Sequence, residues 1–289
     1  MSKYLECSEG PLSAWQSVCL SFVRALPYGL RGKRRLARWL LKLPEGRARV
    51  LMHSGNKITV PNLQEPVAWS SAVDGFYEPE TVSVLKRWLT TSGMFVDVGA
   101  NIGIISLEIA REFSRTPVFA IEAVPRYAEL LTANALANGL SNVEVHNVLC
   151  GEIENAETSF WQAPDSHFGM GSRAPQFRAE AEVKLPMRKL DSMLSQRERV
   201  AAIKIDVEGF EAEVIAGAKK IIERDRPPIV FEFAEWAELR RERHPPGTAQ
   251  RLLLDMGYQL WVLPDYLANK PPLQSPLLKG GAMLVALAG

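Results

Sequence analysis

Short apolar segments alternate with amphipathic segments from residue 94 to residue 233, and this alternation restricts the fold more than any other feature of the sequence. The apolar segments, which we predict to be strands, are residues 94–98, 118–121, 143–149, 201–205 and 229–233. The intervening segments with apolar residues at helical spacing are residues 104–113, 126–137 and 211–223. Strands joined by helices form parallel sheets with helices on both faces. The sequence therefore predicts an α/β fold with a mostly parallel sheet.

The last part of the sequence predicts a change of strand direction. Residues 258–263 and 283–287 are predicted to be two further strands, and the Pro-rich segment between them is too short to include a full crossover helix. Neighbouring strands that lack such a crossover run antiparallel. We therefore predict an antiparallel edge formed by the carboxyl-terminal strands.

The chain is predicted to have three parts. Residues 1–57 form a basic helical extension, residues 58–92 an adaptor with one helix, and residues 93–289 the main domain. The adaptor helix is predicted to start near Pro79, because proline suits the first turn of a helix. An insertion at about residues 156–194 separates the third and fourth strands, and we expect it to be hairpin-like with a glycine-rich tip.

The positive charge of the chain is concentrated at its start. The whole sequence has 34 Lys and Arg against 33 Asp and Glu, whereas residues 1–57 have eleven against three. Apolar residues within residues 36–43 follow helical spacing between basic ones, as in helices at membrane interfaces. We favour a helix that packs on the main domain with its basic face in solvent. Peripheral contact with the inner face of a membrane through residues 18–49 is the alternative.

The composition excludes several classes of protein. With 47% hydrophobic residues and a net charge of +1, the chain is not predicted to be disordered. It has no apolar run of the roughly 18 residues that cross a membrane, and its start lacks the pattern of a secretory signal. Three widely spaced cysteines without a CxxC pair fit a reducing compartment, and four histidines without HExxH argue against zinc hydrolysis. We therefore expect a cytoplasmic protein.

Glycines and carboxylates follow the first two predicted strands, at the edge where doubly wound sheets bind their ligands. Asp97 lies near the end of the first strand, and Gly99 and Gly103 allow a tight turn and close packing of the next helix. Glu122 follows the second strand, nineteen residues after Gly103. A carboxylate at this place accepts hydrogen bonds from the two hydroxyls of a ribose. The turn and the carboxylate together predict a nucleoside cofactor.

The turn fits S-adenosylmethionine better than a nicotinamide or flavin dinucleotide. Asn101 stands within the turn, which lacks the second glycine that lets a pyrophosphate lie against the backbone. Asp97 suits a cationic amine, such as that of a methionine group. We therefore predict S-adenosylmethionine as the cofactor. The residues of this turn and the next strand that we expect to bind it are Asp97, Gly99, Asn101, Gly103 and Glu122.

Three blocks of the sequence resemble the FkbM family of methyltransferases. They are GFYEPE at residues 75–80, FVDVGANIG at residues 95–103 and IKIDVEGFE at residues 203–211. The third block is the most specific, and the resemblance extends over about residues 73–262. Ala123 departs from the family, which usually has proline directly after the ribose-binding acid, and we expect this change to loosen the turn.

The resemblance implies a class I, Rossmann-like methyltransferase fold and S-adenosylmethionine as the cofactor. It implies methylation of a hydroxyl on a sugar, a glycan or a secondary metabolite. It adds Glu78 and Asp206 to the residues expected to bind the cofactor, and Glu232 also occupies a family-like position. The implied partner is a small-molecule or glycan acceptor.

Three carboxylates are predicted to carry the chemistry, because the ends of the fourth and fifth strands are neighbours. Asp206 and Glu208 follow the fourth strand, and Glu232 lies near the end of the fifth. An aliphatic hydroxyl is a poor nucleophile and gains from a carboxylate base or a metal ion. We assign Asp206 to positioning and Glu208 to the role of base or orienting group. A divalent ion held by these oxygens is an alternative.

Other roles remain open for individual residues. Glu208 and Glu211 could instead cap the following helix or pair with Lys204. His167, in the tip of the insertion, is an alternative base. Cys150 has no neighbour in the sequence that marks it as a nucleophile.

Two other functions compete with this prediction. The basic extension could hold phosphate groups, as in an RNA or other nucleic-acid methyltransferase. The Asn/Asp-Pro-Pro-aromatic tetrad of base amino-methylation is missing after the fourth strand, which argues against this function. A non-catalytic module that binds the cofactor or docks on a membrane is the second competitor. The intact polar residues at the strand ends argue against it.

Overall fold

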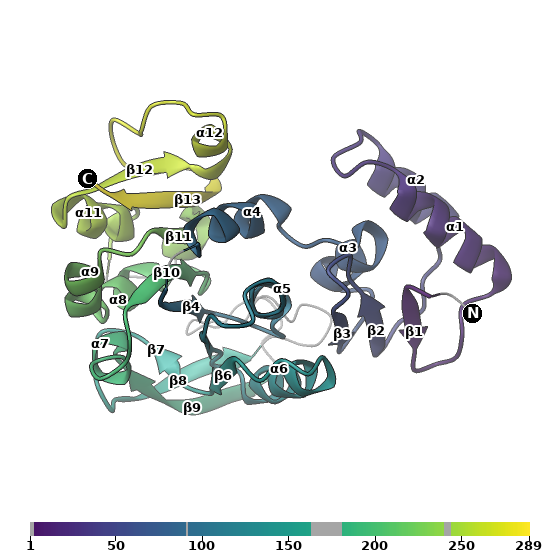
Figure 1. The fold of residues 1–289 in the computed structure, drawn as a ribbon, viewed down its shortest axis with the longest axis horizontal. Coiled ribbons are helices and arrows are strands. Elements are labelled where there is room, and N and C mark those ends of the chain that lie inside the picture. Colours follow the sequence, from purple (N-terminus) through teal and green to yellow (C-terminus); the bar gives the residue numbers. More distant parts are fainter. Residues whose placement is uncertain (1–2, 91, 163–180, 240–243) are drawn as a thin grey trace.

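The structure is a computed structural model of the chain, and it describes residues 3–90, 92–162, 181–239 and 244–289. A seven-stranded sheet forms the middle of the main domain (Figure 1). Its strands, in order across the sheet, are β12 (Tyr258–Val262), β13 (Gly281–Ala288), β11 (Ile229–Ala234), β10 (Val200–Ile205), β4 (Met94–Val98), β5 (Val118–Ile121) and β6 (Val143–His146). The pairs from β11 to β6 are parallel, and β13 is antiparallel to both of its neighbours. The predicted α/β sheet with an antiparallel edge is confirmed.

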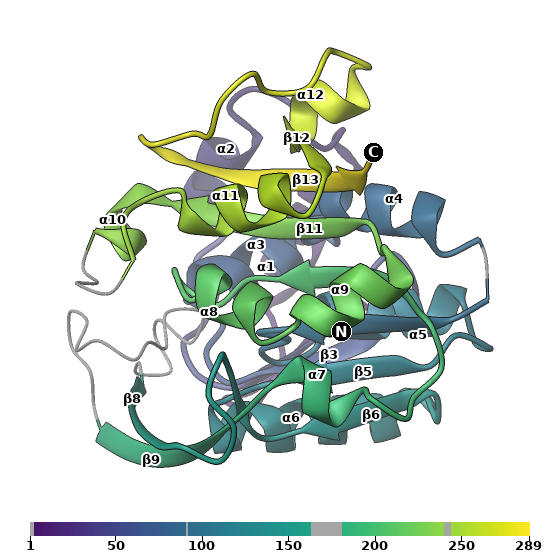
Figure 2. The ribbon, with the colours of Figure 1, turned by 90° about the vertical axis from the view of Figure 1, so that its left-hand side faces the viewer.

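The inner strands form at mostly apolar runs because helices cover both faces of the sheet. One face is covered by α4 (Pro79–Trp88), α5 (Ile104–Glu112) and α6 (Pro125–Ala137). The other face is covered by α8 (Glu211–Ala216), α9 (Lys219–Asp225) and α11 (Thr248–Asp255), which lie in front of the sheet in Figure 2. Three shorter helices are α7 (Leu190–Met193), α10 (Glu235–Glu238) and α12 (Leu263–Leu267). All residues of β4, β5 and β10 are buried between the two layers.

The strand order reverses at β4, and this reversal positions the site. The chain continues from β4 outward to β5 and β6, and then returns to β10 on the other side of β4. The carboxyl ends of β4 and β10 therefore border the crevice in which sheets of this type bind ligands. In the register of these two strands, Asp97 is the partner of Lys204.

The third strand is shorter than predicted. β6 ends at His146, and the side chain of Asn147 donates hydrogen bonds to the backbone oxygens of Glu122 and Ala123, at 2.8 and 2.9 Å. The chain therefore leaves the sheet at this point instead of continuing to residue 149. The same two bonds hold the turn at Ala123, which the sequence analysis expected to be loose.

The predicted helix over residues 211–223 is divided in two at Gly217. A Cβ atom at this position would lie 2.0 Å from the backbone oxygen of Gly151, so the chain segment after β6 passes close to the helix backbone. The helix consequently ends as α8 and restarts as α9. Helical spacing in the sequence does not reveal this contact, because Gly151 lies outside the segment.

The insertion contains the expected hairpin. β8 (Glu157–Gln162) and β9 (Ala181–Arg188) are antiparallel, and the short strand β7 (Leu149–Cys150) pairs parallel with β9. The tip of the insertion, with the candidate base His167, lies outside the described residues.

Residues 3–75 form an N-terminal layer at one end of the molecule (Figure 1). Its elements are β1 (Leu5–Cys7), α1 (Ala14–Ala25), α2 (Lys33–Leu40), β2 (Ala48–Leu51), β3 (Lys57–Val60) and α3 (Pro66–Asp74). The three strands form one antiparallel sheet. The predicted boundary after residue 57 falls on the first residue of β3, and the division into three parts stays a prediction. No helix among the described residues combines the length and the apolar character needed to cross a membrane.

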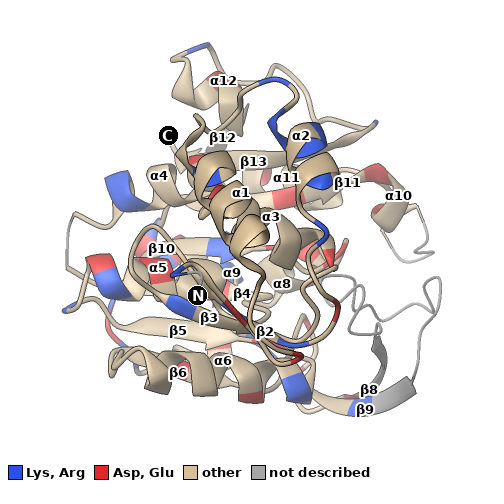
Figure 3. Ribbon diagram, turned by 90° about the vertical axis from the view of Figure 1, so that its right-hand side faces the viewer, with Lys and Arg blue, Asp and Glu red and all other residues tan. Residues whose placement is uncertain are grey.

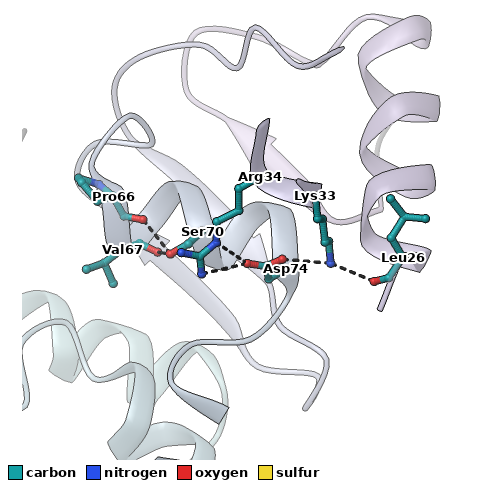
Figure 4. A network of polar contacts seen from close by, with 7 residues as sticks. All are labelled: Leu26, Lys33, Arg34, Pro66, Val67, Ser70 and Asp74. Atoms are coloured by element: carbon teal, nitrogen blue, oxygen red, sulfur yellow. Dashed lines mark hydrogen bonds and ion pairs between the residues drawn. The ribbon is translucent and has the colours of Figure 1, made fainter. Parts of the chain in front are cut away.

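Two buried cations hold the N-terminal layer together. Lys33 Nζ lies 3.0 Å from Asp74 Oδ1 and donates to the backbone oxygen of Leu26 at 3.0 Å (Figure 4). Arg24 donates to a backbone oxygen of α3 at 2.8 Å and to one of β2 at 2.7 Å. Two basic residues of the extension therefore make structural contacts inside the layer instead of facing solvent.

Candidate functional site

A cavity of about 380 Å³ lies at the carboxyl ends of β4, β5, β10 and β11. Its size is in the range of sites that hold small molecules and cofactors. The predicted site residues that line it are Glu78, Asp97, Gly99, Asn101, Glu122, Asp206, Glu208 and Glu232. The fold thus brings together residues that are far apart in the sequence.

Gly103 lies behind the cavity wall instead of lining it. Its φ is 90°, and a Cβ atom at this position would lie 2.6 Å from Leu107 Cδ1 and 2.8 Å from Leu131 Cγ. The missing side chain allows α5 and α6 to pack closely. Gly103 therefore supports the site through the position of these helices.

The turn after β4 brings the backbones of two strands close together. Gly99 has a φ of 78°, and a Cβ atom there would lie 1.8 Å from the backbone oxygen of Asp206. Asn101 has a φ of 52°, a left-handed conformation that Asn adopts more readily than most residues. The turn therefore requires glycine at residue 99, and backbone forms this part of the cavity wall.

Glu122 is fixed by two backbone amides. Its Oε2 accepts a hydrogen bond from Asn101 N at 2.8 Å, and its Oε1 accepts one from Val124 N at 2.7 Å. Each carboxylate oxygen retains a lone pair for a further donor, such as a ligand hydroxyl. Burial raises the pKa of the Glu122 carboxyl to about 7.

A buried lysine joins the carboxylates at the ends of β4 and β10. Lys204 Nζ lies 3.3 Å from Asp97 Oδ1 and 3.4 Å from Asp206 Oδ2, and the lysine side chain is 4% exposed. Burial lowers the pKa of Lys204, but the neighbouring carboxylates outweigh burial and raise the pKa overall. The ammonium group therefore stays charged inside the protein.

Asp97 is almost fully enclosed, although its place in the turn predicted a contact with a cationic ligand. Its Oδ2 accepts a hydrogen bond from Ser106 Oγ at 2.6 Å, and its Oδ1 faces Lys204. Its side chain is 1% exposed, whereas that of Asp206 is 25% exposed. Asp206 therefore offers the more accessible carboxylate to a cationic ligand.

Two further carboxyl groups have an oxygen that lacks a hydrogen bond. The Oε2 atoms of Glu78 and Glu232 are buried and have no hydrogen-bond partner in the described part of the chain. Burial raises the pKa of both groups, and the charge of Asp206 adds to the shift. The pKa of Glu232 reaches about 9, so this group holds a proton at neutral pH. Buried oxygens of this kind are suited to a ligand that supplies the missing partner.

Glu208 and Glu211 have different surroundings after β10. Glu208 has a φ of 54°, in the left-handed region that non-glycine residues seldom adopt. Glu211 Oε1 accepts hydrogen bonds from Val207 N and Gly209 N, both at 3.1 Å. Glu211 therefore stabilises the turn, while Glu208 lines the cavity. Retained backbone strain of this kind is common at functional sites.

Glu65 and Tyr77 line the cavity and were absent from the predicted site. Glu65 caps α3, accepting hydrogen bonds from two amides of that helix at 2.7 and 3.0 Å, and burial raises its pKa to about 7. Tyr77 lies between this cavity and a second one of about 420 Å³, since it lines both. The Glu65-Pro66 pair is a signal for a helix start. It could have located the cap, but not its place in the cavity.

The described residues give no support for Cys150 as a nucleophile. They also contain no cluster arranged to bind a metal ion. Burial raises the pKa of Cys150 to about 12, so the residue is a thiol at neutral pH. Among the residues that the structure describes, no group of three or more His, Cys, Asp and Glu is arranged to hold a metal ion. Within these residues, the carboxylates at the ends of β4 and β10 surround Lys204 instead.

The strand order is that of the class I, Rossmann-like methyltransferase fold. In this fold one antiparallel strand lies between two parallel strands at one edge of the sheet, as β13 lies between β11 and β12 here. The sequence model of the methyltransferase FkbM domain matches residues 97–260, which are more than half of the chain. The chain therefore belongs to the FkbM methyltransferase family, and S-adenosylmethionine is its cofactor. The resemblance seen in the sequence is confirmed.

Relatives of the chain include two proteins named as methyltransferases. Methyltransferase sdnD of Sordaria araneosa is 26% identical over 161 residues, which cover 45% of this chain and 61% of sdnD. Methyltransferase 1 of Beauveria bassiana is 26% identical over 195 residues, which cover 59% of this chain and 76% of that protein. Among solved structures, methyltransferase FkbM of Methylobacillus flagellatus is 17% identical with a TM-score of 0.42, covering 68% of this chain and 45% of that one. The chain thus matches less than two thirds of the length of sdnD.

Proposed function

We propose that this methyltransferase methylates a hydroxyl oxygen of a sugar, a glycan or a secondary metabolite. The observation that carries the proposal is the group of carboxyl side chains at the ends of β10 and β11. Asp206, Glu208 and Glu232 line the same cavity. An aliphatic hydroxyl needs a base when it attacks, whereas a neutral amine attacks through a free lone pair. A set of strand-end carboxyl groups therefore favours an oxygen acceptor.

The residues of the cavity fit the cofactor. Glu122 can accept hydrogen bonds from ribose hydroxyls, and the backbone at Gly99 leaves room for a ligand. Asp206, together with the buried oxygens of Glu78 and Glu232, suits a molecule that carries a cationic amine and a sulfonium. When bound, S-adenosylmethionine supplies a methyl group made electrophilic by the positive sulfur.

The main task of the protein in this reaction is to hold the acceptor oxygen in line with the bond that breaks. The bound cofactor would supply the methyl carbon to this oxygen, and its sulfur would keep the electron pair of the carbon–sulfur bond. The hydroxyl proton passes to a carboxylate. We assign this proton to Glu232, whose buried Oε2 has no hydrogen-bond partner in the described part of the chain, because a cationic ligand beside this carboxyl favours its ionised form. Glu208 orients the hydroxyl, and Asp206, paired with Lys204, positions the cofactor.

Replacing Glu232 with Gln is expected to slow methyl transfer by about 10²–10⁴-fold, the usual contribution of a general base. Cofactor affinity is expected to fall much less than the rate, because glutamine keeps the shape of the side chain and Asp206 keeps its charge. Glu208→Gln is expected to have the smaller effect. Transfer of labelled methyl into an acceptor extract and calorimetric binding of S-adenosylmethionine measure the two quantities.

Glu223→Gln, an exposed position on α9, is the control for the charge change. Full transfer activity in both Glu232→Gln and Glu208→Gln would refute the assignment of these two roles. The acceptor class is tested separately by mass spectrometry of glycans and small metabolites from cells with and without the protein. A methyl group gained on nitrogen or sulfur alone would overturn O-methylation.

Cofactor affinity is expected to rise as the pH increases from about 6 to about 8, because the raised pKa of Glu122 leaves its carboxyl partly protonated near neutrality. The ionised form is the better acceptor for ribose hydroxyls, so binding releases a proton. The stability of the ligand-free protein is expected to fall as the pH rises over this range. The contribution of Glu122 is complete below its unfolded pKa and is lost as the pH rises through about 7.

Calorimetry across this pH range, in buffers of different ionisation enthalpy, measures both the affinity and the proton release. Glu122→Gln is expected to remove the part of the pH dependence that belongs to this carboxyl. S-adenosylhomocysteine lacks the sulfonium charge. Comparing the pH dependence of its affinity with that of S-adenosylmethionine distinguishes the effect of Glu122 on ribose binding from the effect of the ligand charge on Glu78 and Glu232. An affinity that falls with rising pH would contradict the assignment.

A further inference from the structure

The outward face of α1 has an unusual composition for a helix at the surface of a protein. The exposed positions of α1 are residues 14, 15, 18, 21, 22 and 25, and they form one continuous stripe at helical spacing. None of them is charged, and Trp15, Val18 and Phe22 are 66%, 63% and 54% exposed. The opposite side of α1, with Leu20 and Val23, is buried in the layer. Large exposed apolar patches of this kind mark interaction sites.

α2 lies beside α1 and supplies the charge that α1 lacks. Gln16 Nε2, near the start of α1, donates to the backbone oxygen of Lys42, just after α2, at 2.6 Å. The two helices are therefore antiparallel, and Trp15 and Trp39 lie at the same end of the pair. Trp39 is 79% exposed. Figures 1 and 3 show both helices in the outermost layer, with basic positions along α2.

The basic residues of this segment divide into buried and exposed groups. No Asp or Glu occurs between Glu9 and Glu45, whereas seven Lys and Arg do. Arg24 and Lys33 are buried and bind groups of the N-terminal layer. The five exposed cations are Arg31, Arg34, Arg35, Arg38 and Lys42. Arg34 also contacts Asp74 at 3.4 Å but stays 61% exposed (Figure 4).

We propose that the outer face of α1 and α2 docks on a membrane surface that contains anionic lipids. An uncharged stripe with Trp and Phe next to a cluster of Lys and Arg is the pattern of helices that lie in a lipid interface. The cations are complementary to anionic headgroups, and the apolar stripe is complementary to the acyl boundary. Ser21, the hydroxyl in the stripe, bonds to the backbone of its own helix at 2.9 Å. The stripe therefore offers little directional hydrogen bonding to a protein partner.

Flotation of the full chain with lipid vesicles tests the proposal. The chain is expected to float with phosphatidylcholine vesicles that contain phosphatidylserine, and not with phosphatidylcholine alone. Binding is expected to weaken as salt is added, because counterions screen the exposed cations. A blue shift of tryptophan emission on the same vesicles is the second readout, since Trp15 and Trp39 would leave water.

Two surface variants separate the apolar and the electrostatic contributions. The triple change Trp15→Ser, Val18→Ser and Phe22→Ser is expected to reduce binding at least tenfold, as a rough figure for losing three apolar anchors. The double change Arg35→Glu and Lys42→Glu is expected to reduce it by more than about tenfold, at roughly fivefold for each lost cation. Leu136→Ser, which changes an apolar side chain that is 76% exposed on α6, is the matched control.

All variants are expected to bind S-adenosylmethionine as the unchanged chain does, because the substituted side chains are exposed and remote from the cavity lining. This measurement confirms that each variant is folded. Failure of the unchanged chain to float with anionic vesicles would overturn the proposal, and so would flotation that is unaffected by both variants. Salt-sensitive binding to RNA without binding to vesicles would assign the exposed cations to nucleic acid instead. Because none of these readouts involves methyl transfer, the result is independent of the proposed activity.

Discussion

Replacing Lys204 with Met is expected to lower the free energy of unfolding by about 3–5 kcal/mol, the usual loss when one partner of a buried ion pair is removed. Asp97, 1% exposed, would keep a negative charge without its cation, and Asp206 would lose the contact at 3.4 Å that holds it. The carboxylates would then repel each other across the cavity or take up protons. Cofactor affinity should fall together with stability. Urea denaturation and calorimetric titration with S-adenosylmethionine measure the two effects.

The N-terminal layer offers a matched control for this change. Lys33 and Asp74 form a second buried lysine–aspartate pair, both 3% exposed, away from the cavity. We expect Lys33→Met to reduce stability by less than Lys204→Met, because Arg34 still contacts Asp74 at 3.4 Å, and to leave cofactor affinity unchanged under conditions in which the protein is folded. Equal losses of affinity in the two variants would show that Lys204 acts through global stability alone. Adding Asp97→Asn to Lys204→Met should restore part of the lost stability.

Gly99→Ala is expected to disrupt the site at its backbone. The left-handed conformation of residue 99 alone costs alanine about 1–2 kcal/mol. The new methyl group would also lie 1.8 Å from the backbone oxygen of Asp206, so the ends of β4 and β10 must separate. We expect a total loss of at least about 3 kcal/mol in stability, and a fall in cofactor affinity of more than about tenfold. Denaturation and calorimetry again measure the two quantities.

Gly139→Ala separates the two parts of this effect. Gly139 follows α6 with a φ of 66°, and an added Cβ would meet no atom within 4 Å. The variant should therefore lose only the conformational cost of about 1–2 kcal/mol and bind the cofactor normally. If Gly99→Ala behaved in the same way, the close approach of β4 and β10 would be irrelevant to binding.

The inner strands β4, β5 and β10 could be predicted because each is a mostly apolar run whose residues are all buried. The errors arose where a contact comes from a distant part of the chain. β6 ends early beside the hydrogen bonds of Asn147 to the turn after β5, and the helix after β10 is divided where Gly151 approaches Gly217. Neither contact leaves a local pattern in the sequence.

In the candidate site, too, some residues could be predicted from the local sequence, whereas the surroundings of others depend on contacts with distant parts of the chain. Glu122 and Asp206 could be located because strand ends in a parallel sheet converge on one edge. The enclosure of Asp97 depends on the register that places it opposite Lys204, and Glu65 reaches the cavity only through the packing of α3. The sequence likewise revealed an amphipathic basic segment in α2. It did not show that the apolar side of the neighbouring helix α1, with Trp15, faces outward.

The position of β13 determines when the central sheet can be completed during synthesis. β13 lies between β11 and β12, although both of those strands precede it in the chain. Until residues 281–288 leave the ribosome, β11 and β12 present unpaired backbone edges, which are prone to pair with other chains. The cavity is also incomplete at that stage, because Met283 forms part of its wall. A partly made chain therefore exposes strand edges that can pair with other chains, and it lacks part of the cavity wall until β13 is added.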